Sequence, residues 1–261
     1  MDKLILIWKY IVYWFKSTNA HGIQSPFVFE LYNDCIIEKN KFYSFDNIES
    51  IRAMLLLSNQ KIEVKDFGAG SKVHNSNTRR ISGIAKYASK SPKFGQILFR
   101  LANKFKPKNI IEIGTSLGIS TMYLAAPNSK TKVYTIEGCP NIAKVAKVNF
   151  KKIGFNNISL INDTFEKALP NLLEQTSEVE MVYIDGNHTK NATLSYFNQL
   201  LPKVTSQSIL IFDDIYWSSE MEDAWEQIKN HPKVTVTIDL FELGIVFFNP
   251  ELSKENFVLR V

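Results

Sequence analysis

The segment Ile111-Glu-Ile-Gly-Thr-Ser-Leu-Gly-Ile-Ser120 decides the fold. It begins as a short apolar run of the kind that forms a buried strand. Gly114 and Gly118 then permit a tight turn in which backbone N–H groups approach a ligand closely, and a helical pattern follows. A strand, a glycine turn and a helix in this order predict a cofactor-binding loop at the end of a sheet strand.

A second glycine segment, Val64-Lys-Asp-Phe-Gly-Ala-Gly-Ser71, offers the same local features. A cofactor loop also needs a second strand, about twenty residues further on, that ends in a carboxylate for a ribose diol. The run Lys132–Glu137 provides such a strand after Glu112, and none follows Asp66. We therefore interpret residues 66–71 as a turn entering a lid. The Gly114–Gly118 spacing lacks the dinucleotide pattern, which disfavours a nicotinamide cofactor.

From residue 109 onward, strand-like apolar runs alternate with helical patterns such as 142–152 and 193–201. This alternation predicts an α/β fold with a parallel sheet and crossover helices. Only Glu242 and Leu243 separate the last two runs, which predicts an antiparallel hairpin. The seven expected strands are 109–114, 132–137, 158–162, 181–185, 208–213, 234–241 and 244–248.

The first part of the chain has a different character. We expect residues 1–90 to form a mainly helical N-terminal extension, with a flexible possible lid at 68–91, and residues 91–261 to form the cofactor-binding domain. The run at 4–15 is too short to span a bilayer, and Lys9 interrupts it. As a helix it is amphipathic, and we expect it to pack on the body or on a second subunit of a homodimer; contact with a membrane surface is the alternative. Its apolar face comprises Leu4, Ile7, Trp8, Ile11, Trp14 and Phe15.

Composition and charge narrow the class of protein. Of the 261 residues, 45% are apolar and 12% aromatic, which excludes a disordered chain. Cys35 and Cys139 have no metal-type spacing, so we expect buried thiols in a reducing, cytoplasmic compartment. The net charge is +5, yet residues 67–111 contain ten cations and no acid, so the remainder is net acidic. This basic segment, 72–108, is either a solvated helix face or a surface that steers an anionic substrate or nucleic acid.

Carboxylates follow two of the expected strands. Asp185 follows the fourth strand, and the pair Asp213 and Asp214 ends the fifth. In a doubly wound sheet these strand ends face the crevice where ligands bind. Three converging carboxylates repel one another, and a hard divalent cation with oxygen ligands relieves that repulsion.

The pattern E-x-G-x-x-x-G-x-S, beginning at Glu112, resembles motif I of the O-methyltransferases related to catechol O-methyltransferase, including a bacterial subgroup to which the run 21–27 is similar. The resemblance covers about residues 95–249 and implies a Rossmann-like class I methyltransferase fold with S-adenosylmethionine as cofactor. It implies that Ser120 contacts the methionine carboxylate and Glu137 the ribose. Asp163 lies near the adenine or is simply an acid at a helix N-terminus. The expected cofactor-binding residues are Glu112, Gly114, Thr115, Ser116, Gly118, Ser120, Glu137, Asp163 and Asp185.

The same resemblance implies a magnesium site at Asp185, Asp213 and Asp214, although the family usually has Asn at the last position. It also implies a general base at His188, where the family often has Lys. Histidine accepts a proton near neutral pH without special tuning. Lys190 is the reserve candidate. Tyr216 and Trp217 are candidates for the acceptor wall, or pack beneath the hairpin.

These expectations describe a metal-dependent methyl transfer to a hydroxyl of a small, possibly anionic, acceptor. One alternative is an RNA acceptor drawn in by the basic segment. No RNA-binding motif supports it, and Asp185-Gly-Asn-His188 replaces the Asn/Asp-Pro-Pro-aromatic signature of N-methylating families. The other alternative is a non-catalytic interaction module that keeps the fold.

Overall fold

The computed structural model describes residues 3–65 and 77–261. The chain divides into two compact units. Unit 1 combines residues 1–37 with 172–261, and unit 2 comprises residues 38–171. The helix α8 (Phe165–Glu174) crosses the boundary between them.

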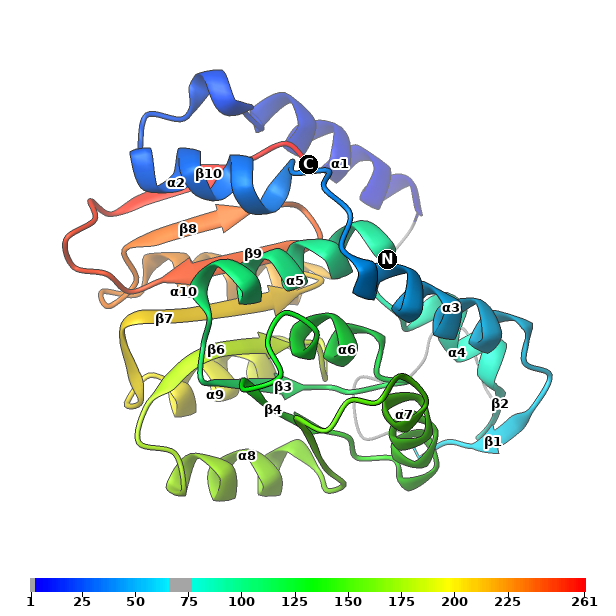
Figure 1. The fold of residues 1–261 in the computed structure, drawn as a ribbon. Helices are drawn as coiled ribbons and strands as arrows, with labels where there is room; N and C mark the ends of the chain where they lie inside the picture. Colours follow the sequence, from blue (N-terminus) through cyan, green and yellow to red (C-terminus); the bar gives the residue numbers. More distant parts are fainter. Residues whose placement is uncertain (1–2, 66–76) are drawn as a thin grey trace. The chain divides into compact units, whose positions relative to one another are not determined.

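Unit 1 contains the C-terminal strands of the fold (Figure 1). Its strands are ordered β10-β8-β9-β7-β6. The pairs β6–β7 and β8–β10 are parallel, whereas β7–β9 and β8–β9 are antiparallel. The elements are α1 (Lys3–Lys16), η1 (Ala20–Gly22), α2 (Pro26–Leu31), η2 (Tyr32–Ile36), β6 (Val179–Ile184), α9 (Lys190–Leu200), β7 (Val204–Asp213), α10 (Ser219–Asn230), β8 (Val236–Asp239), β9 (Leu243–Phe247) and β10 (Glu255–Val258).

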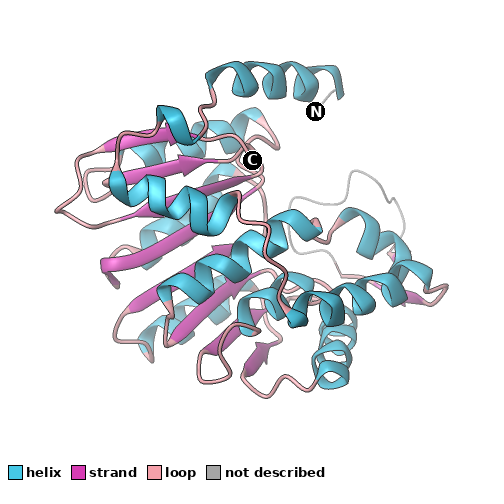
Figure 2. Cartoon of the chain, turned by 45° about the horizontal axis from the view of Figure 1, so that its top comes forward, coloured by secondary structure: helices cyan, strands magenta, loops and turns pink. Residues whose placement is uncertain are grey.

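Helices cover both faces of these strands (Figure 2). The ring of Phe27 on α2 meets Phe247 of β9 edge-on, with centroids 5.0 Å apart. A Cβ at Gly244 of the same strand would lie 2.7 Å from the indole of Trp225 on α10. Because side chains alternate along a strand, positions 244 and 247 point to opposite faces, so α2 and α10 cover opposite sides.

The predicted C-terminal hairpin is confirmed, but the predicted strand number is wrong. The mixed sheet has eight strands in the described part of the chain, because β10 adds a parallel partner to β8. Its four residues, Glu-Asn-Phe-Val, include only one buried side chain, that of Phe257. So short a run has little periodicity, and only pairing with β8 makes it a strand.

Unit 2 contains three strands that are parallel, as predicted. Their order in the sheet is β3-β4-β5. A separate antiparallel hairpin, β1–β2, precedes them. The elements are α3 (Tyr43–Leu57), β1 (Lys61–Glu63), β2 (Thr78–Arg80), α4 (Ile81–Tyr87), α5 (Pro92–Phe105), β3 (Asn109–Ile113), α6 (Ile119–Ala125), β4 (Lys132–Ile136), α7 (Pro140–Ile153) and β5 (Ile158–Ile161).

The prediction of a flexible stretch at 68–91 is wrong for residues 78–87, which form β2 and α4. Ile81, Ile84 and Ala85 of α4 are buried in the core with α3 and α5. Glycine, serine and lysine dominate the composition here and conceal this short apolar spacing. The predicted turn at 66–71 lies outside the described residues.

The helix α1 is formed as predicted, but its expected packing on the body through the apolar face is wrong. Leu4, Trp8 and Phe15 of that face are exposed. The opposite face contacts unit 1, through Lys9 and the buried Tyr13. No helix in the described part of the chain is long and apolar enough to cross a membrane.

Two glycines with positive φ allow a matched test of packing in unit 2. Gly118 (φ +86°) precedes α6, and a Cβ there would lie 2.4 Å from a ring carbon of Phe150. Gly154 (φ +85°) ends α7, and a Cβ there would have no other atom within 4 Å. We expect Gly154→Ala to cost about 1–2 kcal/mol of backbone strain, and Gly118→Ala to cost a further 1–3 kcal/mol, approximately, of overpacking.

Thermal unfolding checks this expectation. The melting temperature of Gly118→Ala should lie at least about 2 °C below that of Gly154→Ala. Equal losses in both variants would mean that the Phe150 ring moves aside without cost.

Candidate active site

The cofactor loop in unit 2 has an unusual backbone. Gly114, Ser116 and Gly118 all have positive φ, between 48° and 107°. The backbone N–H groups of Gly114 and Thr115 both donate to the carbonyl of Ile136, each at 3.1 Å. This anchoring to β4 fixes the turn between β3 and α6, as the glycine pattern predicts.

Glu137 connects the end of β4 to this loop. Its Oε2 accepts a hydrogen bond from the Ser116 backbone N–H at 2.9 Å, and its Oε1 accepts one from the Cys139 N–H at 2.8 Å. The side chain is half-buried. A carboxylate accepts hydrogen bonds at both oxygens, which is the chemistry that a ribose diol requires.

Glu112, by contrast, is fully buried. Its Oε2 accepts hydrogen bonds from the hydroxyls of Thr121 and Thr135, the latter at 2.6 Å. Burial raises the pKa of the Glu112 carboxyl to about 7, against the hydroxyl hydrogen bonds from Ser120, Thr121 and Thr135 that lower it. The side chain therefore joins β3, β4 and α6 from the inside.

The structure also places three further residues of the predicted cofactor site, Thr115, Ser120 and Asp163. The Thr115 side chain is buried, with its hydroxyl 2.6 Å from that of Thr135. Ser120 is buried beside Glu112. Asp163 is exposed, and its Oδ1 accepts a hydrogen bond from the Thr164 N–H at 2.8 Å. This last contact is to the adjacent residue, which precedes α8.

S-adenosylmethionine fits the donors that this part of unit 2 offers. The turn from Gly114 to Gly118 presents backbone without bulky side chains at its two glycines. Glu137 supplies a carboxylate at the end of the neighbouring strand. The residues present thus have the chemical groups that the predicted cofactor, S-adenosylmethionine, requires.

A second cluster lies in unit 1, after β6. The Nε2 atom of His188 lies 3.5 Å from Oδ1 of Asp185. The hydroxyl of the buried Tyr183 donates to Oδ2 of the same carboxylate at 3.1 Å. Tyr183 and Asp185 are two residues apart and therefore lie on the same side of the chain at the strand end. Their contact holds Asp185, and sequence reasoning did not identify Tyr183.

The parallel register of β6 and β7 places Ile184 opposite Phe212. The residues that follow them, Asp185 and Asp213, therefore leave adjacent strand ends. Asp213 is buried, and the backbone of Asp214 has a φ of 53°.

These carboxylates suit a hard divalent cation in their chemistry. However, in the described part of the chain no three His, Cys, Asp or Glu side chains are grouped closely enough to hold a metal ion. A metal at Asp185, Asp213 and Asp214 requires their side chains to turn toward one another.

The remaining candidates in unit 1 have other partners. Lys190 pairs with Asp223 of α10. Tyr216 donates to Oδ2 of Asp239 at 2.7 Å and stacks on Phe241, with ring centroids 5.0 Å apart. Tyr216 is thus held against the β8–β9 hairpin, one of the two places predicted for it.

Trp217, the second candidate for the acceptor wall, is 41% exposed. Its indole is thus the more accessible of the two aromatic side chains, since Tyr216 is half-buried.

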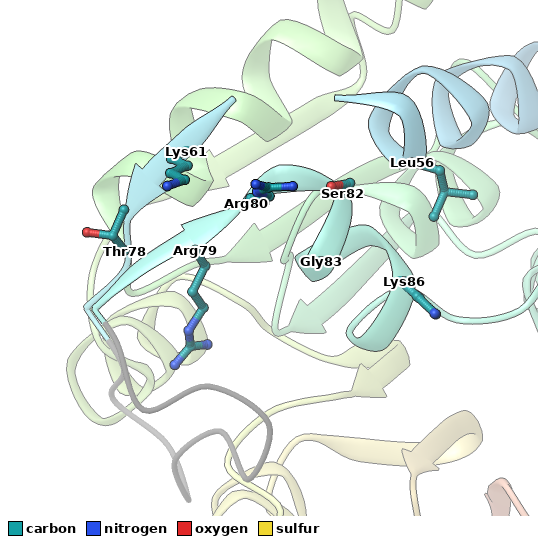
Figure 3. A pocket seen from close by; sticks show the side chains of 8 residues that line it. All are labelled: Leu56, Lys61, Thr78, Arg79, Arg80, Ser82, Gly83 and Lys86. Carbon is teal, nitrogen blue, oxygen red and sulfur yellow. The ribbon is translucent and has the colours of Figure 1, made fainter. Parts of the chain in front are cut away.

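A basic cavity of about 530 Å³ lies elsewhere in unit 2 (Figure 3). Its cationic side chains are Lys61, Arg79, Arg80 and Lys86, and its lining residues include no acid. Such a cavity complements an anion in charge. None of the predicted cofactor, metal or base residues lines it. The remaining lining residues are Leu56, Thr78, Ser82 and Gly83.

Comparisons with known proteins agree with this fold. Residues 111–215 match a family model described as a methyltransferase domain. A catechol O-methyltransferase of Niastella koreensis is 28% identical over 138 residues, which are 52% of this chain and 62% of the relative. One of Mycobacterium tuberculosis is 26% identical over 48% of this chain and 56% of the relative. The chain thus spans about three fifths of the length of these two relatives.

Solved structures share the fold. The O-methyltransferase from Bacillus cereus, in complex with SAH, has a TM-score of 0.56 and 18% identity, covering 84% of this chain and 96% of its own. An O-methyltransferase from Klebsiella pneumoniae has a TM-score of 0.58 and 16% identity, covering 80% and 91% respectively.

The glycine loop and the strand-end carboxylates belong to a fold that solved O-methyltransferases share, and residues 111–215 match a methyltransferase domain. Both named relatives are catechol O-methyltransferases, so this part of the chain is similar to O-methyltransferases of that type.

The buried carboxyl of Glu112 predicts a pH dependence of stability. The unfolded chain releases this proton near the ordinary pKa of 4.5, whereas the folded protein holds it until about pH 7. Between these values the folded state binds more protons, so the contribution of Glu112 to the free energy of unfolding falls as pH rises. Glu112→Gln removes this contribution.

We therefore expect Glu112→Gln to gain stability relative to the unmodified protein between pH 5 and 7.5, on the order of 2–3 kcal/mol. Chemical denaturation of both proteins at each pH measures the difference in their free energies of unfolding. The contributions of all other titrating groups cancel in this difference. A difference that does not change with pH would contradict the raised pKa.

Proposed function

We propose that the protein transfers the methyl group of S-adenosylmethionine to a hydroxyl oxygen of a small-molecule acceptor, with His188 as the general base. The observation that carries this proposal is the pairing of His188 with Asp185, whose carboxylate is 3.5 Å from Nε2. A histidine beside a carboxylate at a strand end is a suitable proton acceptor near neutral pH.

The proposal gives each cluster one task. The loop from Gly114 to Gly118 and the Glu137 carboxylate of unit 2 hold the cofactor, which when bound supplies an electrophilic methyl group. His188 and Asp185 of unit 1 serve the acceptor. In the transfer a carbon–oxygen bond forms as the carbon–sulfur bond breaks, and the hydroxyl proton passes to His188.

Asp185 and Tyr183 support His188 in this role. If Nε2–H points to Asp185, the other ring nitrogen, Nδ1, keeps its lone pair for the acceptor's proton. The negative carboxylate then stabilises the imidazolium that forms. The hydroxyl of Tyr183 holds the second carboxylate oxygen, which keeps Asp185 in place.

A divalent cation, expected to be magnesium, would be held by Asp185, Asp213 and Asp214. When bound, it would lower the pKa of the acceptor hydroxyl. The support for this part of the proposal is the type of the three ligands and their position at adjacent strand ends.

Replacement of His188 tests the base. With catechol as acceptor, we expect His188→Ala to lower kcat by about 10²–10⁴. Calorimetry with S-adenosylmethionine should give an unchanged Kd, because no cofactor task is assigned to this residue. The matched control is His21→Ala, an exposed histidine of η1 outside both clusters, which should leave turnover unchanged.

Full activity of His188→Ala would contradict the assignment of the base. Failure of the unmodified protein to bind S-adenosylmethionine would instead favour the non-catalytic interaction module.

Metal dependence is tested separately. We expect EDTA to abolish turnover and added Mg²⁺ to restore it, because the cation is proposed to activate the hydroxyl. Asp185→Ala should remain inactive at any Mg²⁺ concentration. Asp214→Asn restores the residue usual in the family and should retain activity. Full turnover of the unmodified protein in EDTA would eliminate the metal from the proposal.

A further inference from the structure

The helix α1 presents its apolar face outward. Leu4 is 73% exposed, Trp8 64% and Phe15 76%. Ile7, Ile11 and Trp14 on the same face are also exposed. Isolated apolar side chains at a surface need no explanation, but a contiguous set of large ones marks an interaction site.

The opposite face of α1 is fixed to unit 1 by specific contacts. Lys9 forms an ion pair with Glu222 of α10, and its side chain is only 14% exposed. The hydroxyl of the buried Tyr13 donates to the Leu259 carbonyl. The rings of Tyr10 and Tyr13 both pack on Phe241, with centroids 5.1 and 5.2 Å away.

These contacts set the rotation of the helix about its axis. Turning the apolar face inward would break the Lys9 ion pair and leave Glu222 without that partner. In Figures 1 and 2, α1 lies along the outside of unit 1, next to the C-terminal segment. The outward orientation of the apolar face is therefore fixed by contacts within unit 1.

The charges around this face indicate its occupant. Residues 3–16 contain three lysines and no acid. Lys16 is exposed in the last turn. The guanidinium of Arg260 lies 4.3 Å from the centre of the Trp14 ring and donates to the Trp14 carbonyl. Cations thus adjoin the apolar face at its C-terminal end.

We propose that α1 attaches the protein to an anionic membrane surface, lying in the plane of the interface. Tryptophan and phenylalanine favour the interfacial region, and neighbouring cations attract anionic lipid headgroups. A helix of 14 residues is too short to span a bilayer. A second copy of the chain is the less favourable occupant, because two such faces would bring cations together and α1 offers no acid to pair with them.

Vesicle co-sedimentation of the full chain tests the proposal. We expect binding to vesicles of phosphatidylcholine mixed with phosphatidylserine, and much weaker binding to phosphatidylcholine alone. Binding should weaken as salt is raised, because the headgroup attraction is screened.

Phe15→Glu should lower the partition constant about tenfold or more, because it places an acid on the proposed contact face. The matched control is Leu57→Glu, which is 81% exposed on α3 of unit 2 and should bind as the unmodified protein does. Both side chains are exposed, so the melting temperatures of both variants should be unchanged within about 1 °C.

Equal binding of the two variants, or no binding to the mixed vesicles, would overturn the proposal. If the unmodified protein binds no vesicles but sediments as a dimer, and Phe15→Glu abolishes that dimer, the face would be assigned to a second copy. Neither readout depends on methyl transfer, so failure here is distinct from failure of the proposed function.

Discussion

The buried carboxylate of Glu112 is the interaction on which the cofactor region depends. It connects three elements, because Glu112 belongs to β3, Thr135 to β4 and Thr121 to α6. Burying an acid is costly unless hydrogen bonds accompany it, and the nearby hydroxyls supply them. Its raised pKa shows that burial outweighs these hydrogen bonds.

The loop that follows β3 is held in position by hydrogen bonds to the end of β4. The Ile136 carbonyl accepts from the backbone of Gly114 and Thr115, and Glu137 accepts from that of Ser116. One strand end thus anchors three consecutive residues in a backbone conformation that includes positive φ values. A preorganised loop of this kind loses less conformational entropy when a ligand binds.

In unit 1, tyrosine hydroxyls hold two carboxylates by hydrogen bonds. Tyr183 donates to Asp185, and Tyr216 donates to the buried Asp239. Burial raises the pKa of both Asp239 and Tyr216 above their ordinary values. The second of these pairs stabilises the hairpin, whereas the first holds the carboxylate that lies 3.5 Å from His188.

Much was determined by the sequence alone. The strands from 109 to 213 and their crossover helices were predicted because short apolar runs alternate regularly with longer helical patterns. The choice of Ile111–Ser120 over the rival glycine segment followed from the strand ending at Glu137, and the structure places that carboxylate on the loop. Cys35 and Cys139 are buried thiols, as predicted.

Only the tertiary structure decided the features that depend on partners distant in sequence. β10 exists because β8 pairs with it, and Tyr216 is held by Asp239, 23 residues away. The sequence predicted that α1 is amphipathic, but not which face turns outward. That choice depends on Glu222 and Leu259, more than two hundred residues beyond α1, because periodicity reports the faces of a helix and contacts alone determine what each face meets.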